Sequence, residues 1–239
     1  MKSVKYTVKM VLSAGVLVLG FGSYQAALAA PTGAYVDVAG GASYLAGSQL
    51  NNMEFPTYTI TPGLDANSSA VPYYSTDFNY TGRAAFGYFF NQDPLNSWAY
   101  GVEMGYDYFS PVNSTGTQSF HSLYSTYNVS GAVKTSAWAS DLDFVISEDV
   151  SEHVSLLYKL GVAYESMTRN FTATQLAGAQ AGAFNSTTNS DTSGVGGLAG
   201  LGIQFNFSKH VALRTEVDGM KGGNNIGYAQ ALAGLVFAF

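Results

Sequence analysis

Large apolar residues alternate with small or polar ones over many stretches of the chain. The stretch from Trp98 to Phe109 shows this most clearly. One of its faces carries Trp98, Tyr100, Val102, Met104, Tyr106 and Tyr108. The other face carries Ala99, Gly101, Glu103, Gly105, Asp107 and Phe109. Because side chains of a β-strand point alternately to its two faces, this period of two predicts a strand with one apolar face.

Eight segments follow this pattern and predict eight strands. They are residues 34–44, 78–90, 98–109, 138–146, 154–165, 195–207, 211–218 and 226–239. Short polar turns follow the second, fourth and sixth segments, at residues 91–97, 147–153 and 208–210. Much longer loops follow the first, third and fifth, and a short one near residues 221–224 follows the seventh. Short turns at one end and long loops at the other are typical of an antiparallel barrel in a membrane.

All charged residues within these segments lie on the face opposite the large apolar side chains. They are Asp37, Arg83, Glu103, Asp107, Asp141, Asp143, Lys159, Glu165, Arg214, Glu216 and Asp218. A soluble β-sandwich could also segregate charge, but its charged face would be rich in lysine and its buried face would lack bands of Tyr and Trp. The pattern predicts an all-β fold, an eight-stranded antiparallel up-and-down transmembrane β-barrel, with the charges in a crowded lumen.

The composition agrees with a wall that faces lipid. Charged residues make up 11% of the chain and aromatic residues 14%, whereas soluble domains average about 25% charged residues. With 16 acidic and 10 basic residues, the net charge is −6, which argues against binding to nucleic acid. The absence of cysteine excludes disulfides, thiolate metal sites and a lipid anchor at a cysteine.

The first 29 residues have the organisation of a signal peptide. Lys2, Lys5 and Lys9 precede a short apolar run over residues 10–22, and residues 27–29 read Ala-Leu-Ala. We therefore predict cleavage after Ala29, so that residues 1–29 are a signal peptide and residues 30–239 the barrel. The apolar run is too short to span a membrane as a helix. Without the three leader lysines, 7 basic and 16 acidic residues remain, and the net charge becomes −9.

The end of the chain supports a family resemblance. Phe237 and Phe239 close a run with an apolar residue at every second position, which resembles the signal read by the bacterial outer-membrane insertion machinery. With the leader and eight strands, the mature chain resembles the small bacterial outer-membrane β-barrel family, which includes the N-terminal barrel of outer-membrane protein A. The resemblance implies export to the outer membrane of a Gram-negative bacterium. It implies contact with outer-membrane lipid and lipopolysaccharide, and with periplasmic chaperones and the barrel-assembly machinery in transit. We expect no peptidoglycan-binding domain after the barrel, so the resemblance does not imply a cell-wall tether.

No motif predicts a cofactor, a metal site or catalysis. Residues 194–199 match a variant of the dinucleotide-binding fingerprint, but that motif requires a following helix, and here a strand is predicted. Two of the three histidines fall in short turns. His121 lies in a long outer loop near Ser119 and Ser122, where serine is too common for proximity to indicate a nucleophile and base.

Counting residues across the predicted turns gives partners for the three lumen bases. The predicted neighbours are Arg83 opposite Gly105 and diagonal to Glu103 and Asp107, Asp141 opposite Lys159, and Gln204 opposite Arg214, with Glu216 and Asp218 further along the same face. Eight acids against three bases leave an excess of negative charge. Unpaired charge is costly in an interior of low dielectric, so we expect some acids to be hydrated, protonated or near the rims.

These features favour a structural or surface-interaction barrel whose long extracellular loops contact a host, phage or other ligand. The alternative is a small cation-preferring channel that opens when a pair such as Asp141–Lys159 exchanges partners. A second alternative, a lipid-modifying enzyme, depends on His121. Fold and location follow from the pattern more directly than activity does.

Overall fold

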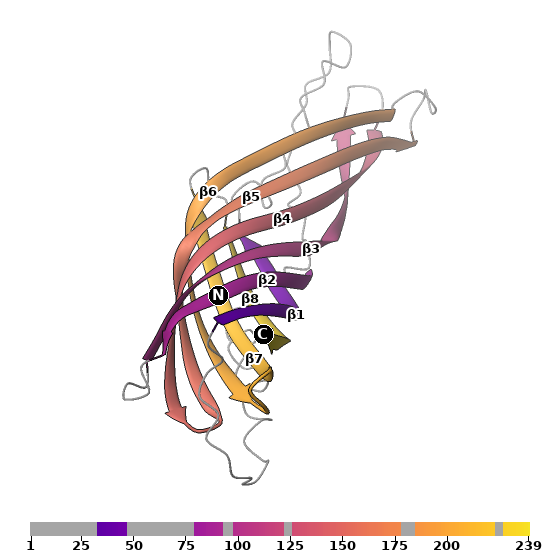
Figure 1. The fold of residues 1–239 in the computed structure, drawn as a ribbon. Coiled ribbons are helices and arrows are strands. Elements are labelled where there is room, and N and C mark those ends of the chain that lie inside the picture. Colours follow the sequence, from indigo (N-terminus) through magenta and orange to yellow (C-terminus); the bar gives the residue numbers. More distant parts are fainter. Residues whose placement is uncertain (1–32, 47–78, 93–97, 122–125, 178–184, 223–226) are drawn as a thin grey trace.

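The computed structural model describes residues 33–46, 79–92, 98–121, 126–177, 185–222 and 227–239, and draws the others as a grey trace (Figure 1). At residues 46, 91–92, 114–121, 126–130, 173–177 and 185–188 only the backbone is described. The predicted signal peptide and its cleavage site lie outside the described residues.

Eight strands form one closed barrel, which confirms the predicted fold class. In chain order they are β1 Gly33–Ala46, β2 Asn79–Gln92, β3 Trp98–His121, β4 Thr126–Ser151, β5 Val154–Ala177, β6 Asn185–Asn206, β7 Val211–Gly222 and β8 Gly227–Ala238. Each strand pairs antiparallel with its sequence neighbours, and β1 pairs with β8. Among the described residues, no helix is long and apolar enough to cross a membrane.

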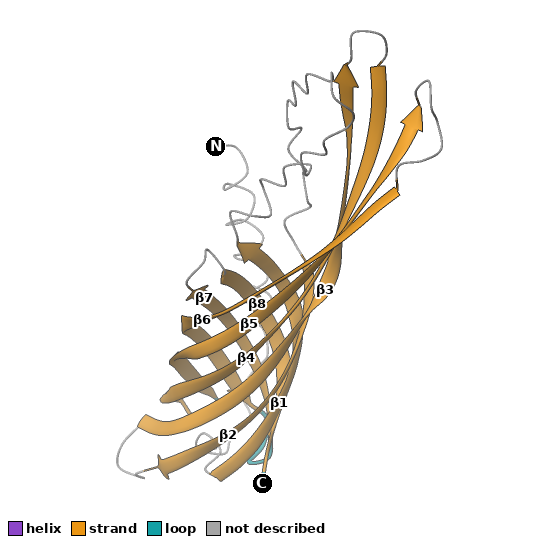
Figure 2. Cartoon of the chain, turned by 90° about the horizontal axis from the view of Figure 1, so that it is seen from above, coloured by secondary structure: helices purple, strands orange, loops and turns teal. Residues whose placement is uncertain are grey.

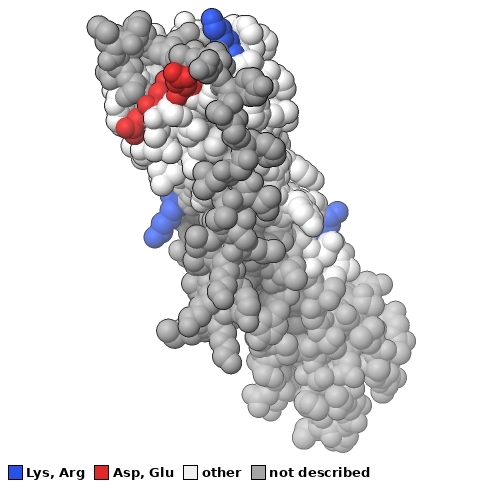
Figure 3. Space-filling model, turned by 90° about the horizontal axis from the view of Figure 1, so that it is seen from below, with Lys and Arg blue, Asp and Glu red and all other residues white. Residues whose placement is uncertain are grey.

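The outward face of the wall is apolar, as the alternation predicts. Met104, Leu142 and Leu160 are 60%, 56% and 69% exposed, respectively. Aromatic rings border this zone at both ends. The ring pairs are Trp98–Tyr158 and Tyr100–Phe144 at one end, and Tyr106–Trp138 and Trp138–Tyr164 at the other. Seen from below, the visible described surface has few charged side chains: the acidic ones gather in one place, and the basic ones stand apart from one another (Figure 3). Such a zone between aromatic bands is the mark of a barrel in lipid.

The β4–β5 connection is much shorter than predicted. β4 continues to Ser151, and only Glu152 and His153 form the turn, in place of the predicted turn at residues 147–153. Polar residues remain in the strand because they find partners across it. The Tyr158 hydroxyl donates to Glu148 at 3.1 Å, and the Ser155 hydroxyl donates to Asp149 at 2.7 Å.

Four strands are much longer than the sequence pattern predicted. β3 to β6 contain 24, 26, 24 and 22 residues, against 12 to 14 in the other four strands. Much of what we predicted as loop after residues 109 and 165 is therefore paired strand. The apolar alternation ends where the strands leave the aromatic bands, but the hydrogen-bonded ladder continues through Thr-, Ser- and Asn-rich sequence. Figures 1 and 2 show these strands running far beyond their neighbours.

We call this extension the outer wall and define it as residues 112–121, 126–135, 168–177 and 185–191. Its two lateral edges have no paired strand among the described residues. β2 pairs with β3 only as far as Phe109, and β6 pairs with β7 only from Gly196 onward. A four-stranded sheet with two open edges therefore continues from the barrel at its loop end, opposite the short turns.

The barrel interior contains two apolar clusters with charged residues between them. β7 shows the order: Ala212 lies in the cluster near the turn end, and Met220 lies in the cluster near the loop end. Arg214, Glu216 and Asp218 lie between these two residues and are all buried. The same order of apolar, charged and apolar residues recurs along β3 and β4. Most of the charged layer thus lies between two groups of apolar side chains.

Candidate functional site

The charged layer, which we call the lumen network, is built from the inward residues of six strands. All eleven charged residues that the sequence places on the inner face are buried, each at most 5% exposed. Gln204 is buried beside them at 1% exposure. The alternation places these side chains on one face of the sheet. Because the sheet closes into a barrel, that face encloses a single volume.

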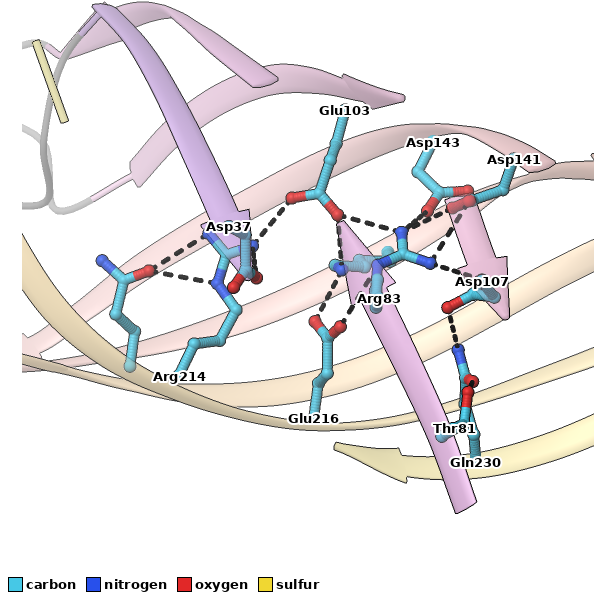
Figure 4. Close-up of polar contacts among 12 residues, drawn as sticks. Asp37, Thr81, Arg83, Glu103, Asp107, Asp141, Asp143, Arg214, Glu216 and Gln230 are labelled. Carbon is cyan, nitrogen blue, oxygen red and sulfur yellow. Dashed lines mark hydrogen bonds and ion pairs between the residues drawn. The ribbon is translucent and has the colours of Figure 1, made fainter. Parts of the chain in front are cut away.

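Glu103 lies at the centre of the lumen network and has no exposed surface. Its carboxylate accepts hydrogen bonds from Lys159 Nζ at 2.7 Å, Arg214 Nη1 at 2.7 Å and Arg83 Nη2 at 3.2 Å. The Tyr35 hydroxyl donates to it at 2.7 Å. Figure 4 shows the Arg83 and Arg214 guanidinium groups converging on this carboxylate. One β3 side chain thus binds groups from four other strands.

Arg83 joins carboxylates on both sides of its own strand. Its guanidinium lies 2.8 Å from Asp107, 2.5 Å from Asp141 and 3.6 Å from both Asp143 and Glu216. A planar guanidinium offers five donors in a fixed fork, which suits a site with several carboxylates around it. The predicted register was two residues out, because Arg83 faces Asp107 directly and not Gly105.

The predicted cross-strand pair of Asp141 and Lys159 is wrong. Asp141 faces Ala163, and Lys159 faces Val145, because the short β4–β5 turn shifts the register. Asp141 binds Arg83 instead. Lys159 Nζ lies 2.6 Å from Glu216, in addition to its bond to Glu103.

The third base, Arg214, has the partner that the sequence predicted. Gln204 faces Arg214 across β6 and β7, and its amide oxygen accepts from the guanidinium at 3.2 Å. The same guanidinium lies 3.1 Å from Asp37 and 5.0 Å from the centre of the Tyr35 ring.

Glycine makes room for these large side chains where Arg83 and Asp141 meet. A Cβ atom at Gly105 would collide with the Arg83 guanidinium and the Asp141 carboxylate. Any side chain there would displace the ion pair between Arg83 and Asp141. A lumen lined by small residues is therefore a condition for the charged layer.

Several members of the interior were not among the residues predicted from the sequence. Tyr35 and Gln230 lie on inward positions of β1 and β8, so their parity could have identified them. Gln230 donates to Asp107 at 3.1 Å and accepts from the Thr81 hydroxyl at 3.3 Å. Arg169 is 6% exposed and lies four residues beyond the predicted end of β5 at Glu165, on the same face. The buried charges of the described interior are therefore eight acids and four bases.

Two predicted network members have weaker connections. The carboxylates of Asp218 and Glu165 are buried, and within the described structure they accept no hydrogen bond and belong to none of the ion pairs. No group of three or more His, Cys, Asp or Glu residues in the described part of the chain could hold a metal ion. The network is therefore an ion-paired core with an excess of acid.

The histidines do not join the lumen network. His153 and His210 lie in the two described turns, as predicted. His121 is the last residue of β3 and not a loop residue. The side chains of His121, Ser119 and Ser122 lie outside the described ones, and with them the arrangement on which the alternative of a lipid-modifying enzyme depends.

The barrel resembles several solved outer-membrane proteins. The attachment invasion locus protein Ail of Yersinia pestis aligns at 12% identity over 87% of this chain and 99% of that chain, with a TM-score of 0.43. OprG from Pseudomonas aeruginosa aligns at 16% identity over 90% of this chain and 99% of that chain, with a TM-score of 0.44. The N-terminal β-barrel domain of OprF from the same organism aligns at 14% identity over 87% of this chain and 98% of that chain, with a TM-score of 0.41.

Among curated proteins, none matches the chain. The family model of the OmpA-like transmembrane domain matches residues 35–232, which extend from the start of β1 into β8. This span includes the lumen network and both aromatic bands. The chain therefore belongs to the family of OmpA-like transmembrane domains, β-barrels of the Gram-negative outer membrane.

Proposed function

We propose that the barrel is a closed membrane anchor that carries the outer wall as an interaction surface outside the cell. The observation behind this proposal is the length of β3 to β6. In β4, the strand continues for 12 residues from Trp138 in the outer aromatic band to Thr126. At about 3.3 Å per residue, this corresponds to roughly 40 Å of strand. A barrel that only stabilises the membrane does not need such an extension.

Among the described residues, both lateral edges of the wall lack a paired strand, so a partner could pair with them. Unpaired edges present rows of backbone N–H and C=O groups, which an extended segment of another protein can pair with. Proteins commonly protect such edges with charged side chains, proline or bulges. In β3, Pro111 and a bulge after Phe109 lie at the base of the wall, and residues 112–120 contain no charge. The chemistry of the wall therefore fits binding to polypeptide at the cell surface, such as a host or phage protein.

The interior supports the anchor part of the proposal. Apolar clusters lie on both sides of the lumen network, and the bases Arg83, Lys159 and Arg214 each bind at least two carboxylates. Conduction would require these contacts to separate in a buried interior, where an unpaired charge is costly. A filled lumen gives the wall a rigid base.

The test is to remove the wall and keep the barrel. Asn113 faces Lys134, and Asn170 faces Asn189. Replacing residues 114–133 and residues 171–188 each by Asn-Gly would close both hairpins with a favoured two-residue turn. Bacteria displaying the full or the trimmed chain are compared for binding to epithelial cells, matrix proteins and phage. The proposal requires binding by the full chain that the trimmed chain loses, at equal outer-membrane levels. Equal binding, or none by either chain, rejects it.

One observation favours a second candidate function, a small cation-preferring pore. The described lumen holds eight acids and four bases, and this excess would favour cations over anions. Lys159→Ala would remove the base that lies between Glu103 and Glu216. Small cation-selective current steps in a planar bilayer that grow in Lys159→Ala would support the pore. If neither the wild-type protein nor Lys159→Ala conducts current, the pore is rejected and the closed anchor remains the proposal.

A further inference from the structure

The turn between β6 and β7 has a compact hydrogen-bonded structure. The backbone N–H groups of Phe207 and Ser208 donate to the Val211 carbonyl at 3.0 and 3.1 Å. The Ser208 hydroxyl oxygen accepts from the N–H groups of His210 and Val211 at 3.2 and 3.0 Å. These bonds fix the backbone of His210, the last residue before β7.

His210 makes two contacts with the end of the chain. The Ala238 N–H donates to the His210 carbonyl oxygen at 2.9 Å. The His210 ring nitrogen Nδ1 lies 3.1 Å from the Ala238 carbonyl oxygen. A carbonyl oxygen can only accept, so Nδ1 must carry the hydrogen and donate it.

These contacts lie where the regular ladder ends. β7 pairs with β8 only as far as Val211 opposite Phe237, so Ala238 has no strand partner on that side. On its other side Ala238 pairs with Tyr35 of β1, and the Phe239 N–H donates to the Ala34 carbonyl at 3.0 Å. The His210 backbone and ring thus hydrogen-bond to Ala238 in place of a further residue pair of the β7–β8 ladder.

We infer that the β6–β7 turn is a latch for the C-terminus and that His210 is its positioning residue. The latch holds Ala238 from the β7 side and thereby aligns the last residues of β8 with β1, at the seam that closes the barrel. The Phe239 ring takes no part in the latch, because that residue is 78% exposed. The inference is independent of the outer wall and of any function proposed for it.

The latch predicts a particular ring tautomer and a particular pattern of amide exchange. In protein purified from outer membranes into detergent, nitrogen NMR of His210 should show hydrogen on Nδ1. His210→Ala should raise the exchange rates of the Ala238 and Phe239 amides roughly two- to tenfold, as expected for one lost hydrogen bond. His210→Asn should preserve slow exchange, because its side-chain amide nitrogen occupies nearly the position of Nδ1. Lys209→Ala, in the same turn, serves as the matched control and should have no effect.

The latch is rejected if the wild-type ring carries its hydrogen on Nε2. It is also rejected if His210→Ala leaves both amides as protected as in Lys209→Ala. If His210→Ala does not fold, the wild-type tautomer and the exchange rates of His210→Asn still decide the question. The His210→Asn variant must then fold and show slow exchange at the Ala238 and Phe239 amides. Fast exchange at both amides in this variant would contradict the inference.

Discussion

Replacing Glu103 by Gln tests whether the lumen network stabilises the barrel. The substitution keeps the shape of the side chain and removes the charge that Arg83, Lys159 and Arg214 share. Breaking a buried ion pair by neutralising one partner costs about 3–5 kcal/mol. Each base retains another carboxylate, at 2.8 Å for Arg83, 2.6 Å for Lys159 and 3.1 Å for Arg214. We therefore expect the lower end of that range, about 3 kcal/mol, which is roughly a hundredfold in the unfolding equilibrium.

The measurement is urea unfolding of barrels inserted in lipid vesicles, followed by the fluorescence of Trp98 and Trp138, the two tryptophans of the chain. Ser147→Ala is the matched control, because Ser147 is also a buried inward residue and its hydroxyl makes no hydrogen bond within the described structure. A loss below about 1 kcal/mol in Glu103→Gln, close to that of the control, would refute our view of Glu103 as the centre of the network.

Three further predictions address the lipid-facing surface of the barrel, the lumen and the chain end. Leu160→Arg places a charge in lipid between the aromatic bands and should lower the unfolding free energy in vesicles by about 2–4 kcal/mol; wild-type stability would mean that the residue does not face lipid. Gly105→Val should destabilise the barrel by about 1–3 kcal/mol through overpacking against Arg83, and unchanged urea unfolding would contradict the crowding seen there. Phe239→Ala should leave the stability of the folded barrel nearly unchanged, because the residue is 78% exposed, yet lower the amount found in outer membranes; normal levels would count against a terminal assembly signal.

The facing of residues could be predicted from the sequence because lipid and lumen impose opposite chemistry on alternate positions. Met104 and Glu103 are neighbours in the chain, yet one is 60% exposed and the other is fully buried. A shift of one residue would place every lumen charge in lipid, so parity is strongly determined. The register between strands is a different matter, since a shift of two residues preserves parity. That is why Asp141 lies on the predicted face but opposite Ala163 and not Lys159.

The length of the strands could not be predicted for a related reason. Beyond the aromatic bands the outer face of a strand meets water, so large apolar residues no longer alternate with polar ones, although the backbone ladder continues and inward residues such as Thr135 and Arg169 are still buried. Asn113 and Lys134 lie in such a region and still form a strand pair. The apolar pattern therefore reports the thickness of the lipid layer and not the end of the sheet. At the turn end, Glu148 and Asp149 misled the prediction in the same way, because charged residues in a strand resemble a turn.

Glu103 also bears on how the barrel can come apart. Its four partners come from separate strands of the barrel: Tyr35 from β1, Arg83 from β2, Lys159 from β5 and Arg214 from β7. Peeling any of these strands away removes a donor from the same carboxylate and weakens the hold on the others. Partial opening is thereby penalised at several positions around the circumference, and the lumen-bearing part of the sheet should unfold as one cooperative unit. The outer wall lies beyond the reach of Glu103, and its two lateral edges have no paired strand among the described residues, so we expect it to fray while the barrel below it stays closed.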